Sequence, residues 1–200
     1  MAEGSIIIGI MSGTSLDGLD IAAVQFNRSG FDILKAETIS YDKGMLDSLQ
    51  NAPLLSSEEL AGLDYAYGKM IGVAVRDFIV RHAISAPLLV ASHGHTVFHN
   101  PDRGYTLQVG NGAAIARWSG CTVVNDFRSG DLSKGGRGAP LVPRGDRDLF
   151  GEYAACLNLG GFSNISYEED GERKAYDISP ANMAINYLAA AKGKTMDEDG

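Results

Sequence analysis

Residues 11–20 concentrate hydroxyl groups, glycines and carboxylates in one connection between two apolar runs. Gly13 and Gly18 allow a ligand to approach the backbone closely, and Thr14 and Ser15 add hydroxyl donors for phosphate oxygens. A connection of this composition indicates a phosphate-binding loop. A plain turn, which glycine and serine also favour, is the alternative. The segment is not a Walker loop, because no Gly-Lys-Ser/Thr follows it.

Two carboxylates lie in the same segment. Asp17 and Asp20 are of the type that binds Mg²⁺ directly or through water. With the neighbouring hydroxyls and glycines, they predict a place for a phosphate group and its metal ion.

Three of the four histidines fall within residues 93–99. Imidazole is a common zinc ligand, but no carboxylate or thiol is adjacent, and His93 and His95 come at a predicted strand end. We therefore expect this segment to contact a hydroxylated substrate at the carboxyl end of a strand. A zinc site is the alternative.

A second glycine cluster follows Asp126 and Arg128. Residues 126–148 hold five basic and four acidic side chains, a balance of +1 in a chain of net charge −8. Such an island is where an anionic substrate or transition state would bind, and Arg128 is its strongest candidate. A surface loop with scattered charges is the alternative.

A third glycine cluster surrounds Gly160 and Gly161, between two predicted strands, and suggests a second phosphate loop. Asp177 follows at the end of another predicted strand. A carboxylate there can act as a general base or a metal ligand. Charge complementarity with a following helix N-terminus would explain it equally well.

The elements that must hold these residues follow from hydrophobic periodicity. Three strands with short connections predict an antiparallel meander, and the later alternation of helix and strand predicts an α/β fold with a mixed sheet and flanking helices. Ser56 and Glu59 form a capping box at the start of a long helix. The predicted strands are 5–11, 19–26, 31–41, 87–92, 121–125, 154–159, 164–167 and 174–178; the predicted helices are 56–83, 112–119 ending at Gly120, and one opening with Pro180; residues 126–138 are predicted to be irregular.

Composition limits the function further. The chain has 200 residues, 44% of them hydrophobic, and 25 acidic against 17 basic side chains. This acidity argues against a nucleic-acid partner, whose phosphates require concentrated Lys and Arg. No apolar run is long enough for a bilayer, so we expect no membrane partner. The N-terminus lacks the features of a signal peptide, so the cytoplasm is the expected compartment.

Six sequence blocks resemble one known family, that of anhydro-N-acetylmuramic acid kinase, and occur in the family's order. The resemblance covers nearly the whole chain. The blocks are MSGTSLDG (11–18), SHGHTVFH (92–99), TLQVG (106–110), DFR (126–128), GGRGAPLVP (135–143) and NLGGFSN (158–164).

The resemblance implies an actin-like ATPase fold of the ribonuclease H-like type. It implies a kinase that uses ATP, Mg²⁺ and water to open 1,6-anhydro-N-acetylmuramic acid and phosphorylate O6 during cell-wall recycling. Asp177 matches the family's base and Arg128 would offset developing negative charge. The implied ATP-binding residues are Gly13, Thr14, Ser15, Leu16, Asp17, Gly18, Leu19, Asp20, Gly160 and Gly161, and the implied sugar-side residues are His93, Gln108, Asp126 and Arg128.

The family also predicts the domain organisation. Residues 1–150 would form the N-terminal lobe and 151–200 the start of a second lobe, most of which would be missing, so that this piece alone would be inactive. A kinase for another amino sugar and a non-catalytic nucleotide-binding sensor are the alternatives. Because the family is commonly dimeric, a homodimer is left open.

Overall fold

The computed structural model describes residues 4–13, 16, 18–28 and 30–194. The chain divides into two compact units, 1–138 and 139–200, and each is described here by itself. The lobe boundary at residue 150 stays a prediction. Among the described residues, no helix is long and apolar enough to cross a membrane. Cys121 and Cys156 are free and half-buried.

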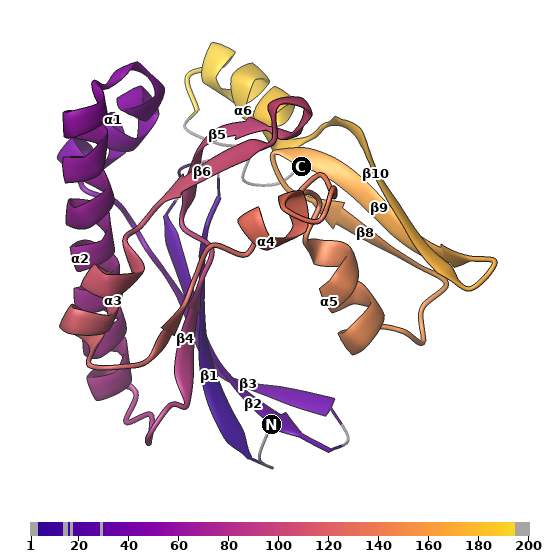
Figure 1. The fold of residues 1–200 in the computed structure, drawn as a ribbon, viewed down its shortest axis with the longest axis horizontal. Helices are drawn as coiled ribbons and strands as arrows, with labels where there is room; N and C mark the ends of the chain where they lie inside the picture. The colour runs from indigo at the N-terminus through magenta and orange to yellow at the C-terminus, as the bar shows by residue number, and fades with distance from the viewer. Residues whose placement is uncertain (1–3, 14–15, 17, 29, 195–200) are drawn as a thin grey trace. The chain divides into compact units, whose positions relative to one another are not determined.

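The first unit is built on a mixed five-stranded sheet, in the order β3-β2-β1-β4-β7 (Figure 1). The predicted meander is confirmed, since β1, β2 and β3 pair antiparallel. The strands β4 and β7 continue the sheet in parallel. The α/β class with a mixed sheet and flanking helices is therefore confirmed. The strands are β1 (Ser5–Ser12), β2 (Leu19–Asn27), β3 (Gly30–Ile39), β4 (Leu89–Ser92) and β7 (Val123–Val124).

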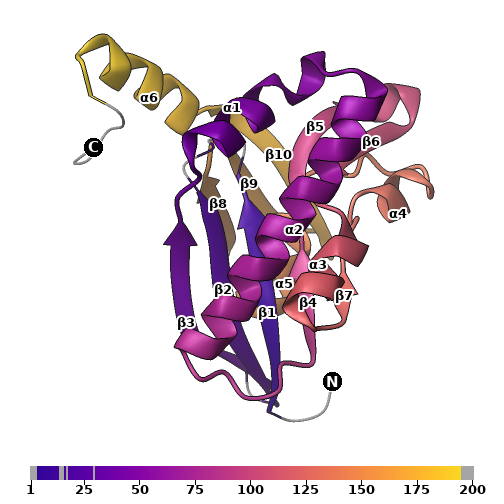
Figure 2. The same cartoon turned by 90° about the vertical axis from the view of Figure 1, so that its left-hand side faces the viewer.

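One long helix, α2 (Ser57–Arg81), covers one face of this sheet (Figure 2). Alternate residues of β1 and β2, such as Ile8 and Ile21, are buried against the apolar stripe of the helix. The predicted capping box is present: Ser56 accepts from the backbone N–H of Glu59, whose carboxylate accepts from the backbone of Ser56. The core thus lies between α2 and the sheet.

Two glycines of α2 allow a second helix to approach very closely. A Cβ on Gly68 would lie 2.6 Å from the backbone oxygen of Asn111, and one on Gly72 would lie 2.8 Å from that of Ile115. Both contacts belong to α3 (Gly112–Ser119) and its N-cap. The prediction of this helix and its C-cap Gly120 is confirmed, with Gly120 in the left-handed conformation.

Three segments of the first unit differ from the sequence prediction. A helix, α1 (Lys43–Asn51), is capped by Asp42 and continues into a 3₁₀ turn, η1 (Ala52–Leu54). The histidine-rich segment forms a hairpin of β5 (His95–Asn100) and β6 (Tyr105–Val109), joined through a second 3₁₀ turn, η2 (Pro101–Arg103). Residues 126–138 are not wholly irregular, because they contain the one-turn helix α4 (Ser129–Leu132).

The second unit contains a three-stranded antiparallel sheet, in the order β10-β9-β8, and two helices. The sequence predicted that Pro180 is the first residue of a helix. In the structure it is the last residue of β10. The helix begins at Asn182 because the carbonyls of Gly160 and Gly161, in the β8–β9 turn, accept hydrogen bonds from the first amides of the helix and from the amide that precedes it. The elements are α5 (Val142–Leu149), β8 (Ala155–Leu159), β9 (Phe162–Glu169), β10 (Glu172–Pro180) and α6 (Asn182–Ala191).

Candidate functional site

The connection between β1 and β2 is fixed at its two ends. The backbone N–H of Leu16 donates to the carbonyl of Gly13 at 3.3 Å, and the Leu16 side chain packs against the core. Gly18 is buried against β3, where a Cβ would lie 2.6 Å from the Thr38 methyl group. Thr14, Ser15 and Asp17, predicted to contact nucleotide or metal, lie outside the described residues.

The two residues that follow the loop point to opposite faces of the sheet. Leu19 is fully buried and is paired with β1 and β3, so only its backbone could reach a nucleotide. Asp20 is exposed, and its Oδ1 accepts a hydrogen bond from the Thr38 hydroxyl. An exposed carboxylate with its second oxygen open fits an oxygen-preferring ion such as Mg²⁺. No cluster of three or more His, Cys, Asp or Glu able to hold a metal occurs among the described residues.

His93 and Arg128 are joined by a direct hydrogen bond. His93 follows β4 and Arg128 precedes α4, and Arg128 Nε donates to His93 Nε2 at 2.9 Å. Since Nε2 accepts, the ring proton is on Nδ1, which lies 2.7 Å from the carbonyl oxygen of Gly94 and donates to it. Both ring nitrogens are therefore engaged, and neither has a lone pair left for zinc or for a substrate proton.

Burial and charge keep this histidine neutral. Desolvation lowers the pKa of His93, and the neighbouring Arg128 guanidinium lowers it further. Burial also lowers the pKa of His95, with a smaller effect from His93. His95 is only 5% exposed, and no described residue bonds to its Nδ1. The carboxyl end of β4 thus holds neutral imidazoles beside one cation.

Arg128 retains most of its hydrogen-bonding capacity. Besides its bond to His93, its Nη1 donates to the carbonyl oxygen of Gly138 at 2.6 Å. A guanidinium has five N–H donors, so three have no acceptor among the residues that the structure describes. Asp126, two residues earlier, is exposed and adopts a left-handed conformation with φ of 58°. It lies between β7 and the turn that contains Arg128.

A row of polar side chains on the β5–β6 hairpin lies close to Arg128. Gln108 Nε2 donates to the Thr106 hydroxyl at 2.7 Å, and His99 Nδ1 lies 3.2 Å from the same oxygen. Burial lowers the pKa of His99, and the charge of Arg128 adds to this effect. The hairpin also packs on the residue after His93, since a Cβ on Gly94 would lie 3.2 Å from Gln108 Cβ. His93, Gln108 and Arg128, all predicted from sequence, thus lie in one polar region of the first unit.

Asp64 of α2, which the sequence did not single out, holds the turn after Gln108. Its carboxylate accepts from the backbone N–H of Gly110 at 2.8 Å and from Asn111 Nδ2 at 2.9 Å. Its backbone carbonyl accepts from the N–H of Asn111 as well. A lone acidic residue on a helix has no sequence feature that would reveal such a role.

Asp177, in the second unit, is exposed and lies beside a β-bulge. It pairs with Asn164, whereas Ser179 pairs with Ser163, so Ile178 is the extra residue. Because Asn164 and Ser163 are consecutive, Asp177 and Ser179 lie on opposite faces of the sheet, although residues two apart normally share one. The bulge therefore separates Ser179 and Pro180 from the register that Asp177 shares with residues 172–176 of β10.

The predicted second phosphate loop has a structural task in this unit. The carbonyls of Gly160 and Gly161 accept hydrogen bonds from the backbone amides of Ala181, Asn182 and Met183. These carbonyls thereby cap the N-terminus of α6. The nucleotide contacts of Gly160 and Gly161 stay a prediction.

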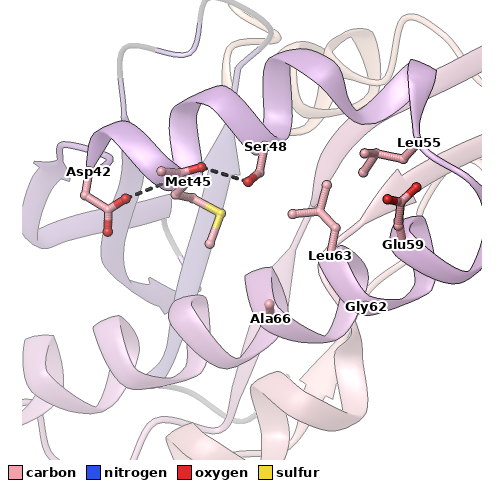
Figure 3. A pocket seen from close by; sticks show the side chains of 9 residues that line it. Asp42, Met45, Ser48, Leu55, Glu59, Gly62, Leu63 and Ala66 are labelled. Atoms are coloured by element: carbon pink, nitrogen blue, oxygen red, sulfur yellow. Dashed lines mark hydrogen bonds between the residues drawn. The ribbon is translucent and has the colours of Figure 1, made fainter.

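A pocket of about 340 Å³ lies between α1 and α2 (Figure 3). Its two carboxylates already serve the helix ends: Asp42 accepts from the Met45 N–H at 2.8 Å, and Glu59 belongs to the capping box. The other lining residues include Met45, Leu55 and Leu63. None of the predicted site residues lines this pocket.

Fold and polar residues together define an α/β protein with a cluster of polar side chains at the carboxyl end of β4. A model of the family described as anhydro-N-acetylmuramic acid kinase matches residues 5–200. The chain therefore belongs to the anhydro-N-acetylmuramic acid kinase family.

Individual relatives agree with this assignment. Anhydro-N-acetylmuramic acid kinase of Pseudomonas putida is 35% identical over 206 residues, which cover 98% of this chain and 56% of that protein. The enzyme of the same name from Acaryochloris marina is 37% identical over 222 residues, covering 97% and 57%. The chain thus spans slightly more than half the length of these relatives. An Aquifex aeolicus member of the Ppx/GppA family matches over 92% of this chain and 54% of its own, with 8% identity and a TM-score of 0.47, too low to carry an argument.

Proposed function

We propose that the protein is an actin-like kinase that opens 1,6-anhydro-N-acetylmuramic acid with water and phosphorylates its O6 at the expense of ATP. Family membership supports this reaction. The observation that carries it is Arg128, held by neutral His93 and by the Gly138 carbonyl with three N–H donors left over. Such a fork suits a carboxylate, a phosphate or developing negative charge.

On the sugar side, Arg128 offsets negative charge as it develops, and His93 orients the guanidinium. Gln108 donates both amide hydrogens within the hairpin, to Thr106 and, at 3.4 Å, to Thr96. Its carbonyl oxygen, to which no described residue donates, accepts from a sugar hydroxyl. Asp126, exposed at the end of β7, accepts from another hydroxyl.

Asp177 acts as the base. It takes a proton from water, the water oxygen bonds to the anomeric carbon, and the bond from that carbon to O6 breaks. O6 then attacks the γ-phosphorus of ATP and ADP leaves, giving N-acetylmuramic acid 6-phosphate. The exposure of Asp177 supports this role, because a base needs an accessible side chain.

Residues 13–20 and the backbone of Gly160 and Gly161 bind the nucleotide. Asp20, with Asp17, would hold Mg²⁺, which neutralises charge on the transferred phosphate when bound. Because ATP is the phosphate donor, we place the enzyme in the cytoplasm. The proposed partners are ATP and the anhydro sugar, and the proposal includes neither nucleic acid nor a membrane. A homodimer belongs to the same proposal, and sedimentation of the full-length protein tests it.

ADP release by the full-length protein, with and without the anhydro sugar, tests the reaction. Release only with the sugar supports it; release only with another amino sugar, or no release despite ATP binding, refutes it in favour of the two alternatives. Asp177→Asn should abolish turnover and the incorporation of ¹⁸O from water at the anomeric carbon. Asp170→Asn, an exposed turn position of the same hairpin, is the matched control and should remain active. Full turnover in Asp177→Asn would remove that residue from the mechanism.

A further inference from the structure

The segment that follows Arg128 folds back around one carboxylate. Asp131 lies in α4, and its Oδ2 accepts a hydrogen bond from the backbone N–H of Gly138 at 2.7 Å. Its own carbonyl oxygen accepts from the N–H of Gly136 at 3.0 Å. Both ends of the glycine-rich stretch are thereby held by this single residue.

Gly138 connects Asp131 to Arg128. Its N–H is bound by Asp131, and its carbonyl oxygen accepts from Arg128 Nη1 at 2.6 Å. Gly138 is buried and has a φ of 65°, a conformation that only glycine adopts freely. Without a partner for its N–H, this glycine could rotate and turn its carbonyl away from the guanidinium.

Residues 136–138 pack closely around the Asp131 carboxylate. The Asp131 carboxylate occupies the space that a Cβ on Gly136 would take. A Cβ on Gly138 would lie 3.2 Å from the Arg128 carbonyl oxygen and 3.1 Å from Leu132 Cγ. Glycine at 136 and 138 is therefore required by the contacts of Asp131 and Arg128, whether or not the loop also touches a ligand.

We propose that Asp131 is a positioning residue, which fixes the Arg128 guanidinium against His93 by holding the backbone of Gly138. The catalytic consequence of this role rests on the proposed function. The geometric role does not, because it is defined by contacts within the first unit. The competing explanation is that an acidic side chain merely favours the first turn of α4 through the helix dipole.

Three variants of the full-length protein separate these explanations. Asp131→Ala removes the acceptor, while Asp131→Asn keeps an acceptor oxygen for the Gly138 N–H but removes the charge. Ser133→Ala is the matched control, since Ser133 Oγ donates to the Gly130 carbonyl at 2.8 Å, a bond in the same loop that does not lead to Arg128. The first readout is the titration of the His93 ring, followed by NMR. Arg128 and His95 are the titratable groups with which His93 interacts.

In Asp131→Ala we expect the pKa of His93 to rise, because the guanidinium that lowers it is no longer held beside the ring. We expect Asp131→Asn and Ser133→Ala to titrate like the wild type. The second readout is turnover of the anhydro sugar: kcat should fall about tenfold or more in Asp131→Ala, because a guanidinium displaced from its position aligns the reacting groups poorly. Asp131→Asn should recover most of this loss.

An unchanged His93 titration in Asp131→Ala would overturn the proposal, as would equal kcat losses in Asp131→Asn and Asp131→Ala, because a role of charge alone predicts the latter. If the wild type does not phosphorylate the anhydro sugar, the proposed function fails. The His93 titration then still decides on Asp131.

Discussion

The close approach of α2 and α3 provides a quantitative test of the fold that carries the site. A Gly→Ala change inside a helix normally stabilises a protein by roughly 0.5–1 kcal/mol. Gly68→Ala should do the opposite, because its Cβ would lie 2.6 Å and 2.7 Å from the backbone oxygen and nitrogen of Asn111. Backbone atoms cannot rotate away as a side chain can, so the two helices must separate.

The cost follows from the distances. Ordinary contact begins at 3.4 Å, so α3 must shift by about 0.8 Å to accommodate the new methyl group. Overpacking of this kind costs about 1–3 kcal/mol. Gly62→Ala is the matched control, since it lies in the same helix and a Cβ there meets nothing within 4 Å. Helix propensity cancels between the two variants, which leaves the overpacking cost as their difference.

Thermal unfolding of the full-length protein measures that difference. A cost of about 1–3 kcal/mol corresponds to a Tm lower by roughly 3–10 °C in Gly68→Ala than in Gly62→Ala. Gly68→Ala should also weaken sugar turnover, because the displaced Asn111 belongs to the turn that Asp64 holds after Gln108. Equal Tm values for the two variants would show that α3 does not pack on α2 as described.

Two further outcomes are expected. His93 and His95 should each be more than half neutral at pH 6.5 by NMR, since burial lowers both pKa values. The unfolded chain then binds more protons, so the free energy of unfolding should fall as the pH drops below about 6.5; a half-protonated ring above that pH would contradict this. Arg173→Met should destabilise the second unit by about 3–5 kcal/mol, because it leaves the buried carboxylate of Asp146 without its cation, which lies 4.0 Å away. The control is Arg144→Met, which removes an exposed cation from α5, the helix that contains Asp146, and should change the urea midpoint little. Similar losses in both variants would refute the argument.

Local sequence features predicted those elements that depend on local physics. The capping box at Ser56 and the 3–4 periodicity after it predicted α2, and Gly120 predicted the end of α3, because both patterns act within a turn of the helix. α1 was missed although Asp42 is a good N-cap, since few apolar positions follow it. Pro180 was misassigned because the contacts that start α6 two residues later come from Gly160 and Gly161, about twenty residues away.

The site was predictable as a set of residues but not as a set of contacts. His93 and Arg128 were identified from their types and their places at strand ends, and Gln108 from the resemblance of its block to the family. Their bonding was not, because Arg128 reaches His93 across 35 residues of chain and is held by Gly138, whose conformation depends on Asp131. Asp64 was missed for the same reason, as its partners lie 46 and 47 residues further on.

Because of the bulge at Ile178, the pairing at the end of β10 depends on how many residues are present there more than on which residue occupies position 178. Any apolar residue at 178 would preserve the pairings of Asp177 with Asn164 and of Ser179 with Ser163. With one residue deleted there, β10 would have a single continuous register. The side chain of either Asp177 or Ser179 would then have to move to the opposite face of the sheet. The N-terminus of α6 is hydrogen-bonded to the β8–β9 turn through the amides of Ala181, Asn182 and Met183, so the deletion would also displace that helix. Variation in this segment should therefore accumulate as substitutions and very rarely as insertions or deletions.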